Sequence, residues 1–450
     1  MSSNSITSTA REHVFPLFVK YVSSNVLGMI GYSCYILADT FFVARGIGSD
    51  AIAALNLVLP AFSLLNGTGL MIGMGAAARY SISSGRADSE IHRTIFTQAL
   101  QLAFVAMLFF FSIGLFFARP LCVLLGADGT TLPHAIPYIS ILLMFSPLFL
   151  CNNLLNCFVR NDGEPRLSMT AMLVGSLTNI VLDIAFVIGL HMGVAGAALA
   201  TILSQALSAV LVLWVLMRTK DMHRLELRKI RFDGRMFHRI IRIGLPAGLQ
   251  SVMYTSSNIL IQSSVNELGT DTVAAWTAYS KIDSLFWMIV NAFGISITTF
   301  VGQNYGAGKM DRVHKGVRTC MGITAGATVL LSVILYNYAS ICYQLFTTDA
   351  QVVVIGEQIL HFLVPTYFTY IAIEILSGTL RGIGDSWLPM IICCLGICVL
   401  RVVWILTAVP LKNDILTIVF SYPLTWTVTS IAFIVYYLFF SRLKTVGSKR

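Results

Sequence analysis

The sequence predicts an all-α polytopic membrane protein with twelve transmembrane helices in two pseudo-symmetric bundles of six. Three observations lead to this class. Apolar residues make up 56% of the 450 positions and charged residues only 11%, whereas soluble domains carry roughly 25% charged residues. The mean hydropathy is +0.78, which suits a bilayer better than a soluble core. Short motifs also recur 221 positions further along the chain, which indicates two copies of one unit.

The internal repeat defines the expected domains. The segment 48–54 returns as 269–275, and Arg160 returns as Arg381. Repeats in a polytopic protein favour a transporter whose two halves move around a central site. We therefore expect an N-lobe at 1–217, a basic cytoplasmic linker at 218–239 and a C-lobe at 240–450.

Apolar stretches of about 20 residues, the length that crosses a bilayer, predict the spans one by one. Six spans per repeat is an even number, so both repeats insert in the same orientation, related by an axis along the membrane normal. The twelve spans lie near 14–43, 52–77, 94–117, 134–157, 167–189, 193–217, 240–265, 273–301, 317–341, 357–379, 387–409 and 415–440.

The positive charges predict the orientation of these spans. With the N-terminus inside, 25 of the 30 Lys and Arg residues fall in inner segments and 3 in outer loops. This bias predicts a plasma (inner) membrane protein with both termini in the cytoplasm. It also accounts for the net charge of +9 without a nucleic-acid partner, since a basic linker can contact anionic lipid.

Motifs of soluble enzymes fail in this chain. The segment 302–310 resembles a phosphate-binding loop, but its spacing is one residue too long and Met310 stands where Ser or Thr would hold Mg²⁺. No His-Glu-x-x-His or Gly-x-Ser-x-Gly motif occurs, and no nucleophile has a base in reach. We therefore expect neither an enzyme nor a cofactor. The nine cysteines lack zinc or redox spacing and are interpreted as small buried hydrophobes.

Ionisable residues inside a span are costly, by about 2.5–3.5 kcal/mol on insertion scales, and so indicate function. Asp39 in the first span and Asp183 in the fifth lie at similar depth below the outer interface. Asn179 is one helical turn before Asp183, and Thr201 in the sixth span lies slightly deeper. Such an oxygen cluster suits Na⁺ and equally suits a proton. The alternative is that each Asp caps a helix end or reaches the interface.

The second repeat provides a control for this cluster. At the spacing of 221, Asp39 becomes Leu260, whereas Asn179 and Asp183 become Leu400 and Trp404. The scaffold is duplicated and the acids are not, which favours a functional role over a structural one.

Further polar residues are candidates for a substrate cavity. Glu374 in the tenth span corresponds to Asn153, and Asn156 lies close to Asn153 in the fourth span. These amides could line a cavity or form interhelical hydrogen bonds. Asp283 in the eighth span could face the same cavity, and we expect Arg401 in the eleventh span to balance Glu374.

Three motifs carry a resemblance to a known family. The segments 37–43, 302–308 and 381–385 resemble the multidrug and toxic compound extrusion (MATE) family, and the resemblance covers essentially the whole chain. It implies a V-shaped twelve-helix fold that exports organic cations or drugs in exchange for inward H⁺ or Na⁺.

The resemblance also implies site residues. Family members with an acidic N-lobe site carry it on residues that match Asp39, Asn179, Asp183 and Thr201 here. The Tyr and Asn residues of the family's fourth span match Tyr138, Asn153 and Asn156. The chain departs from a branch with acids in spans 7 and 10, because Tyr370 stands where that branch has its span-10 Asp. We therefore expect cation coupling in the N-lobe.

The sequence thus predicts a secondary antiporter for organic cations, drugs or other amphiphilic toxic compounds, coupled to H⁺ or Na⁺. The alternative is a flippase for a lipid-linked precursor, which should need a more cationic cavity. The expected partners are the lipid bilayer and small organic molecules, and we expect the protein to function as a monomer.

Overall fold

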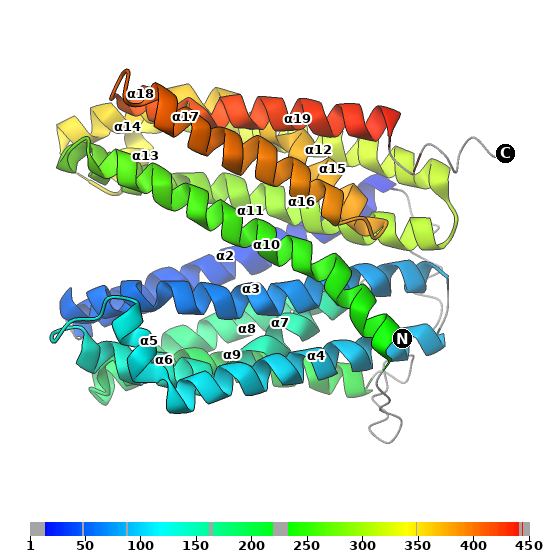
Figure 1. Cartoon of the computed structure of the whole chain (residues 1–450), viewed down its shortest axis with the longest axis horizontal. Helices are drawn as coiled ribbons and strands as arrows, with labels where there is room; N and C mark the ends of the chain where they lie inside the picture. Colours follow the sequence, from blue (N-terminus) through cyan, green and yellow to red (C-terminus); the bar gives the residue numbers. More distant parts are fainter. Residues whose placement is uncertain are drawn as a thin grey trace. The chain divides into compact units, whose positions relative to one another are not determined.

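The computed structural model describes residues 14–46, 49–86, 89–161, 165–218, 233–347, 349–440 and 443. Within these ranges every regular element is helical and no strand occurs. The chain divides into two compact units, shown with their helices in Figure 1. Unit 1 comprises Met1–Arg11 and Ser23–Gly248, and unit 2 comprises Glu12–Val22 and Leu249–Arg450. Residues 219–232 of the predicted basic linker lie outside the described residues.

Unit 1 is built from the helices of the first repeat. Two long helices, α2 and α10, each contribute to both units. The elements of unit 1 are α2 (Val14–Gly46), α3 (Ser49–Gly85), α4 (Ser89–Phe116), α5 (Ala118–Leu124), α6 (Leu132–Met144), α7 (Ser146–Asn161), α8 (Pro165–Asp183), the π-helical η1 (Ile184–Gly189) and α9 (Gly193–Arg218).

Unit 2 repeats this order. It contains α10 (Gly234–Asn266), α11 (Thr270–Gly306), α12 (Met310–Asn337), α13 (Ala339–Gln344), α14 (Ala350–Leu363), the 3₁₀ segment η3 (Val364–Tyr370), α15 (Ile371–Gly382), α16 (Trp387–Cys393), the π-helical η4 (Cys394–Val399), α17 (Leu400–Ala408), α18 (Ile415–Val419) and α19 (Ser421–Phe439).

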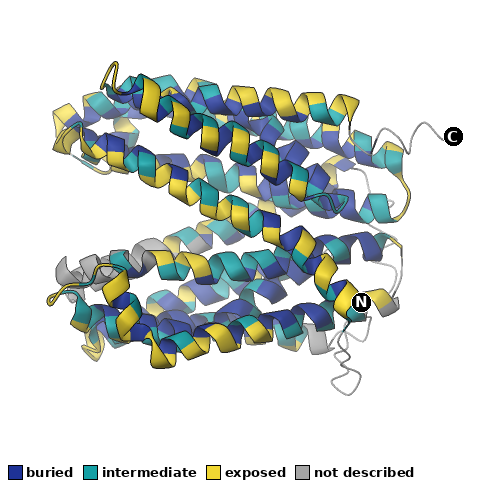
Figure 2. Cartoon of the chain, viewed as in Figure 1, coloured by how far each residue is buried: buried dark blue, intermediate teal, exposed yellow. Residues whose placement is uncertain are grey.

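Each unit has its own core, and exposed residues lie along the outer helix faces (Figure 2). Many of the exposed residues are large and apolar. Such faces suit lipid contact, since a bilayer solvates apolar surface that water would not. The first turns of α2 belong to the core of unit 2, where the Phe18 ring lies 5.0 Å from that of Phe300. The core of unit 2 therefore includes the start of α2, and the core of unit 1 includes the start of α10. The sequence assigned each of these helices to a single repeat.

The described helices confirm most of the predicted membrane spans. Ten are long and apolar enough to cross a membrane, and the pair α6 and α7, bent by 53°, makes an eleventh when the two helices are taken as one span. The break lies at Phe145, just before Pro147, whose ring cannot continue a regular helix. The expected single helix at 134–157 is therefore two helices, and the chain is a multi-pass membrane protein.

The seventh predicted span, at 240–265, is α10, which has the length but not the apolar composition of the others. It has 33 residues, and Ser, Thr, Asn and Gln recur between Gln250 and Ser264. In unit 2, Ser251, Thr255 and Asn258 are exposed on one face of this helix. A polar face at membrane depth requires water or protein polar groups beside it.

Candidate functional site

Asp183 is a fully buried carboxylate at the end of α8 in unit 1. Its side chain is 0% exposed, beside Asn179 at 1% and Thr201 at 3%. With the Asn179 amide oriented to satisfy both its atoms, Nδ2 donates to Asp183 Oδ2 at 3.2 Å. In the same orientation Asn179 Oδ1 accepts from the Thr201 backbone N–H at 3.3 Å. Three of the four residues predicted for cation coupling therefore meet where α8 packs on α9.

Asp39, the fourth predicted member, lies within α2, and its side chain lies outside the described part of the structure. The backbone of α2 still has a defined register on α8. A Cβ at Gly28 would lie 3.6 Å from Met169 Cα, and one at Gly31 would meet Leu173. The contacts advance by similar steps on both helices, so the helices run parallel.

The asparagines of α7 form a polar ladder that joins three helices of unit 1. Asn152 donates to Gln205 on α9, and Asn156 Nδ2 donates to Asn152 Oδ1 at 2.8 Å. Ser168 on α8 donates to Asn156 Oδ1 at 2.9 Å. In unit 1 Asn156 therefore makes one interhelical hydrogen bond, from Ser168, of the kind that the sequence left as an alternative to a cavity-lining role.

Two further candidates of the fourth span lie apart from this ladder. Asn153 donates to Asn66 Oδ1 of α3 over a long 3.4 Å contact. Tyr138 of α6 packs against a small apolar cluster of Val187, Val194 and Ala197. Tyr138 therefore contacts the segment that follows Asp183, on the side of η1 and α9.

In unit 2, Asp283 of α11 is held firmly by hydrogen-bond donors. Tyr367 OH donates to Oδ1 at 2.7 Å, and Trp287 Nε1 donates to Oδ2 at 2.7 Å. The Tyr279 hydroxyl lies 3.3 Å from that of Tyr367. Lys281, two residues away, is exposed while Asp283 is buried, so the two charges point to different surroundings. Short bonds from two donors are what a carboxylate needs inside a membrane protein.

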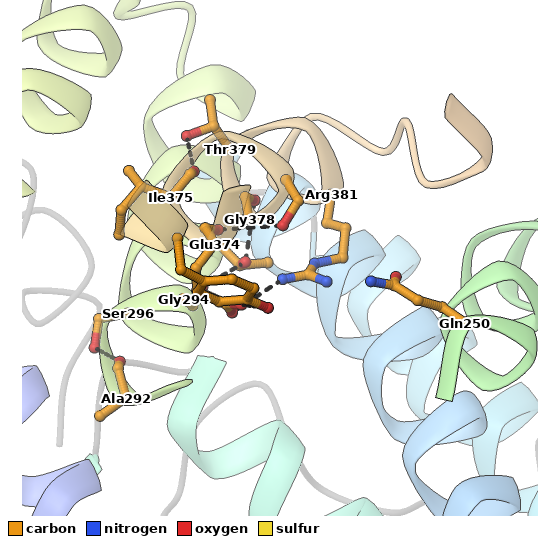
Figure 3. A network of polar contacts seen from close by, with 12 residues as sticks. Gln250, Ala292, Gly294, Ser296, Glu374, Ile375, Gly378, Thr379 and Arg381 are labelled. Carbon is orange, nitrogen blue, oxygen red and sulfur yellow. Dashed lines mark hydrogen bonds and ion pairs between the residues drawn. The ribbon is translucent and has the colours of Figure 1, made fainter. Parts of the chain in front are cut away.

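Glu374 of α15 has weaker partners. Arg381 Nη2 lies 3.5 Å from Oε1, and Tyr370 OH donates to Oε2 at 3.5 Å. The carboxylate lies against Gly294 of α11, whose missing side chain leaves the room for it. Figure 3 shows the carboxylate beside the Arg381 guanidinium, with Gln250 pointing toward the same arginine. The side chains of Glu374 and Arg381 are only 12% and 14% exposed.

The expected pairing of Glu374 with Arg401 is wrong. Arg401 Nη1 donates to Asn258 Oδ1 at 3.2 Å, and its guanidinium carbon lies 4.2 Å from the ring centroid of Tyr422. The partner of the Glu374 carboxylate is instead Arg381, which lies two turns further along the same helix. That spacing of seven residues was readable from the sequence.

The known proteins that this chain resembles settle its family. The sequence profile of the MatE family matches twice, at residues 25–185 and 246–407. The chain belongs to the MatE family. The two matches begin 221 positions apart and end 222 apart, so the family pattern is itself the internal repeat.

The relatives of this MATE protein include proteins named for drug resistance and for transport. It is 25% identical over 438 residues to the probable multidrug resistance protein YoeA of Bacillus subtilis, which covers 95% of this chain and 93% of the relative. It is 26% identical over 336 residues to the FAD transporter of Shewanella oneidensis, which covers 73% of each. A solved structure described as the outward-facing conformation of a multidrug resistance MATE family transporter matches with a TM-score of 0.91, 22% identity and 98% coverage of both chains. The predicted family and fold class are therefore confirmed.

Several residues that contact the candidate site of this MATE transporter were not predicted from the sequence. Trp287 is four residues after Asp283, a helical spacing that could have suggested the contact. Tyr367 is 84 positions away from Asp283, and Gln205 is 53 away from Asn152. Only the packing of distant helices brings these donors to their acceptors.

Proposed function

We propose that this MATE transporter is a secondary antiporter that exports organic cations, drugs or other amphiphilic toxic compounds in exchange for inward H⁺ or Na⁺. The observation that carries the proposal is Asp183, a carboxylate with no exposed surface, in contact with the Asn179 amide. We assign cation coupling to Asp39, Asn179, Asp183 and Thr201.

The chemistry of this cluster supports cation exchange. A buried carboxylate is costly unless a proton or a cation neutralises it or donors satisfy it. The amide and hydroxyl oxygens of Asn179 and Thr201 add neutral ligands of the kind that hard cations accept. Binding and release of one cation would thus change the charge of the α8–α9 packing and shift the balance between conformations.

The driving force is adequate for export. One charge crossing 100 mV releases about 2.3 kcal/mol, and a tenfold concentration gradient adds roughly 1.4 kcal/mol. Together these terms support a gradient of several hundred-fold for a neutral substrate. The family's transporters operate in a bilayer, and we place this one in the plasma membrane as a monomer with cytoplasmic termini.

The polar groups of unit 2 suit substrate contact. Asp283 and Glu374 are acidic and lie among aromatic rings, with the Trp287 ring centroid 4.7 Å from that of Tyr370. Acidic and aromatic groups together attract organic cations. A flippase for a lipid-linked precursor is the second candidate, but Arg381 and Arg401 of unit 2 already have partners in Glu374 and Asn258.

Transport in proteoliposomes tests the proposal. A pH gradient and a Na⁺ gradient are imposed separately, and efflux of a fluorescent organic cation is measured for each. We expect at least one gradient to drive efflux, and ATP alone to drive none. Efflux that persists after both gradients are collapsed would remove the antiporter assignment, and movement of a lipid-linked probe instead would favour the flippase.

A further inference from the structure

The two units differ by one residue in the helix that carries Asp183. Burial of residues 165–170 matches that of 386–391, 221 positions later, at five of six positions. For 171–188, burial matches 393–410, 222 positions later, at 17 of 18 positions, and a spacing of 221 gives only three matches. Unit 2 therefore carries one extra residue before position 393.

The π-helix η4 (Cys394–Val399) begins just after this extra residue. A π-turn closes an i→i+5 hydrogen bond and so contains one residue more than an α-turn. In unit 1 the π-helix η1 follows Asp183, whereas in unit 2 η4 precedes Leu400. The stretch from Cys393 onward is therefore offset by one residue relative to unit 1.

This shift changes the counterparts of the unit 1 site. Asn179 corresponds to Arg401, and Asp183 corresponds to Ile405, which corrects the expected counterparts Leu400 and Trp404. Arg401 and Ile405 are each 4% exposed. A guanidinium thus lies where unit 1 has its amide, and an apolar side chain lies where unit 1 has its carboxylate.

The partners correspond as well. On the next helix the spacing is again 221, so Thr201 of α9 corresponds to Tyr422 of α19. Thr201 contacts Asn179 in unit 1, and the Tyr422 ring lies 4.2 Å from the Arg401 guanidinium carbon. A cation over an aromatic face inside a protein is attracted by the ring quadrupole. In unit 2 the cation beside Tyr422 is therefore part of the chain, the guanidinium of Arg401.

We propose that Arg401 is a resident cation that occupies, in unit 2, the place at which unit 1 exchanges its coupling cation. Arg401 is a specificity-determining residue that restricts exchange to unit 1. The statement that unit 1 exchanges a cation rests on the proposed function. The statement that the Arg401 guanidinium fills the corresponding place in unit 2 does not depend on it.

Chemical replacement of the arginine tests the inference. In purified full-length protein, Arg401→Ala removes the guanidinium, and ethylguanidinium is then added as the probe. We expect a saturable rise in Tm and a change in tryptophan fluorescence, since the Trp426 ring centroid is 5.4 Å from that of Tyr422. Wild-type protein and Lys281→Ala, which removes an exposed cation of α11, are expected to respond at least several-fold less.

The ring provides a second arm. In the Arg401→Ala background, Tyr422→Phe keeps an aromatic face and should keep the response, whereas Tyr422→Leu should abolish it. An equal response in Lys281→Ala, or a response that survives Tyr422→Leu, would overturn the inference. If Arg401→Ala does not fold, Arg401→Lys and Arg401→Met are compared. The inference requires that Arg401→Lys retain the wild-type Tm more closely, and equal loss contradicts it.

Transport separates this inference from the proposed function. Absence of gradient-driven efflux by the wild-type protein would overturn the antiporter while leaving guanidinium binding to Arg401→Ala intact. Efflux by the wild-type protein, with no guanidinium response in Arg401→Ala, would overturn only the resident cation.

Discussion

Glu374 and Arg381 form an ion pair within one helix, with Arg381 Nη2 3.5 Å from Glu374 Oε1 and both side chains largely buried. The first repeat has the arginine without the acid. Arg160, the counterpart of Arg381, instead lies 3.4 Å from Cys157 Sγ, and Asn153 stands in the place of Glu374. The same place is therefore occupied by a Glu–Arg ion pair in unit 2 and by an arginine and an amide in unit 1.

This difference predicts unequal effects of two matched substitutions. Arg381→Ala leaves Glu374 without its counter-charge, and removing one partner of a buried pair costs about 3–5 kcal/mol. Arg160→Ala leaves no acid behind and should cost clearly less. Thermal unfolding of the two purified variants measures the difference. Similar losses of Tm would show that the Glu374–Arg381 contact contributes little.

Gly294 allows Glu374 to approach α11. A Cβ at this position would overlap the Glu374 carboxylate, so Gly294→Ala should destabilise the protein by about 1–3 kcal/mol, the usual cost of overpacking. Gly322→Ala in α12 is the control, because no atom lies within 4 Å of its Cβ and alanine favours a helix over glycine. A Gly294→Ala variant as stable as Gly322→Ala would contradict the close contact.

The coupling assignment predicts the behaviour of the unit 1 acids. Asp39→Asn and Asp183→Asn should each abolish gradient-driven efflux while the protein still folds, because neither amide can exchange a proton or carry a balancing charge. Glu374→Gln should weaken substrate binding more than the response to the cation. Transport and cation-induced fluorescence are measured on the same preparations. Asp414→Asn, at a partly exposed position before α18 where the carboxylate pairs with Lys412, serves as the control.

The opposite pattern would relocate the coupling site. If both unit 1 variants retain full transport and Glu374→Gln loses the cation response, coupling belongs to unit 2.

The charge bias predicts which loops face outward. In a cysteine-free background, single cysteines at Gly129 and Asn413 should react with an impermeant thiol reagent added to intact cells. A cysteine at Glu226, in the basic linker, should react only after the membrane is opened. Labelling of position 226 in intact cells would reverse the assigned orientation.

The sequence by itself determined the class, the repeat and the site candidates of unit 1. Apolar length and composition define a span regardless of its neighbours, because the bilayer acts on each helix separately. The meeting of Asn179 with Asp183 is likewise local, since residues four apart share a helix face. These predictions needed no knowledge of how the helices pack.

Tertiary structure alone decided which polar groups satisfy one another. Donors to buried acceptors come from helices far apart in sequence, as with Tyr367 and Asp283. The one-residue shift beside η4 makes Arg401, not Leu400, the counterpart of Asn179. A π-turn rotates all later side chains while leaving composition and hydropathy unchanged, so the sequence pattern could not reveal it.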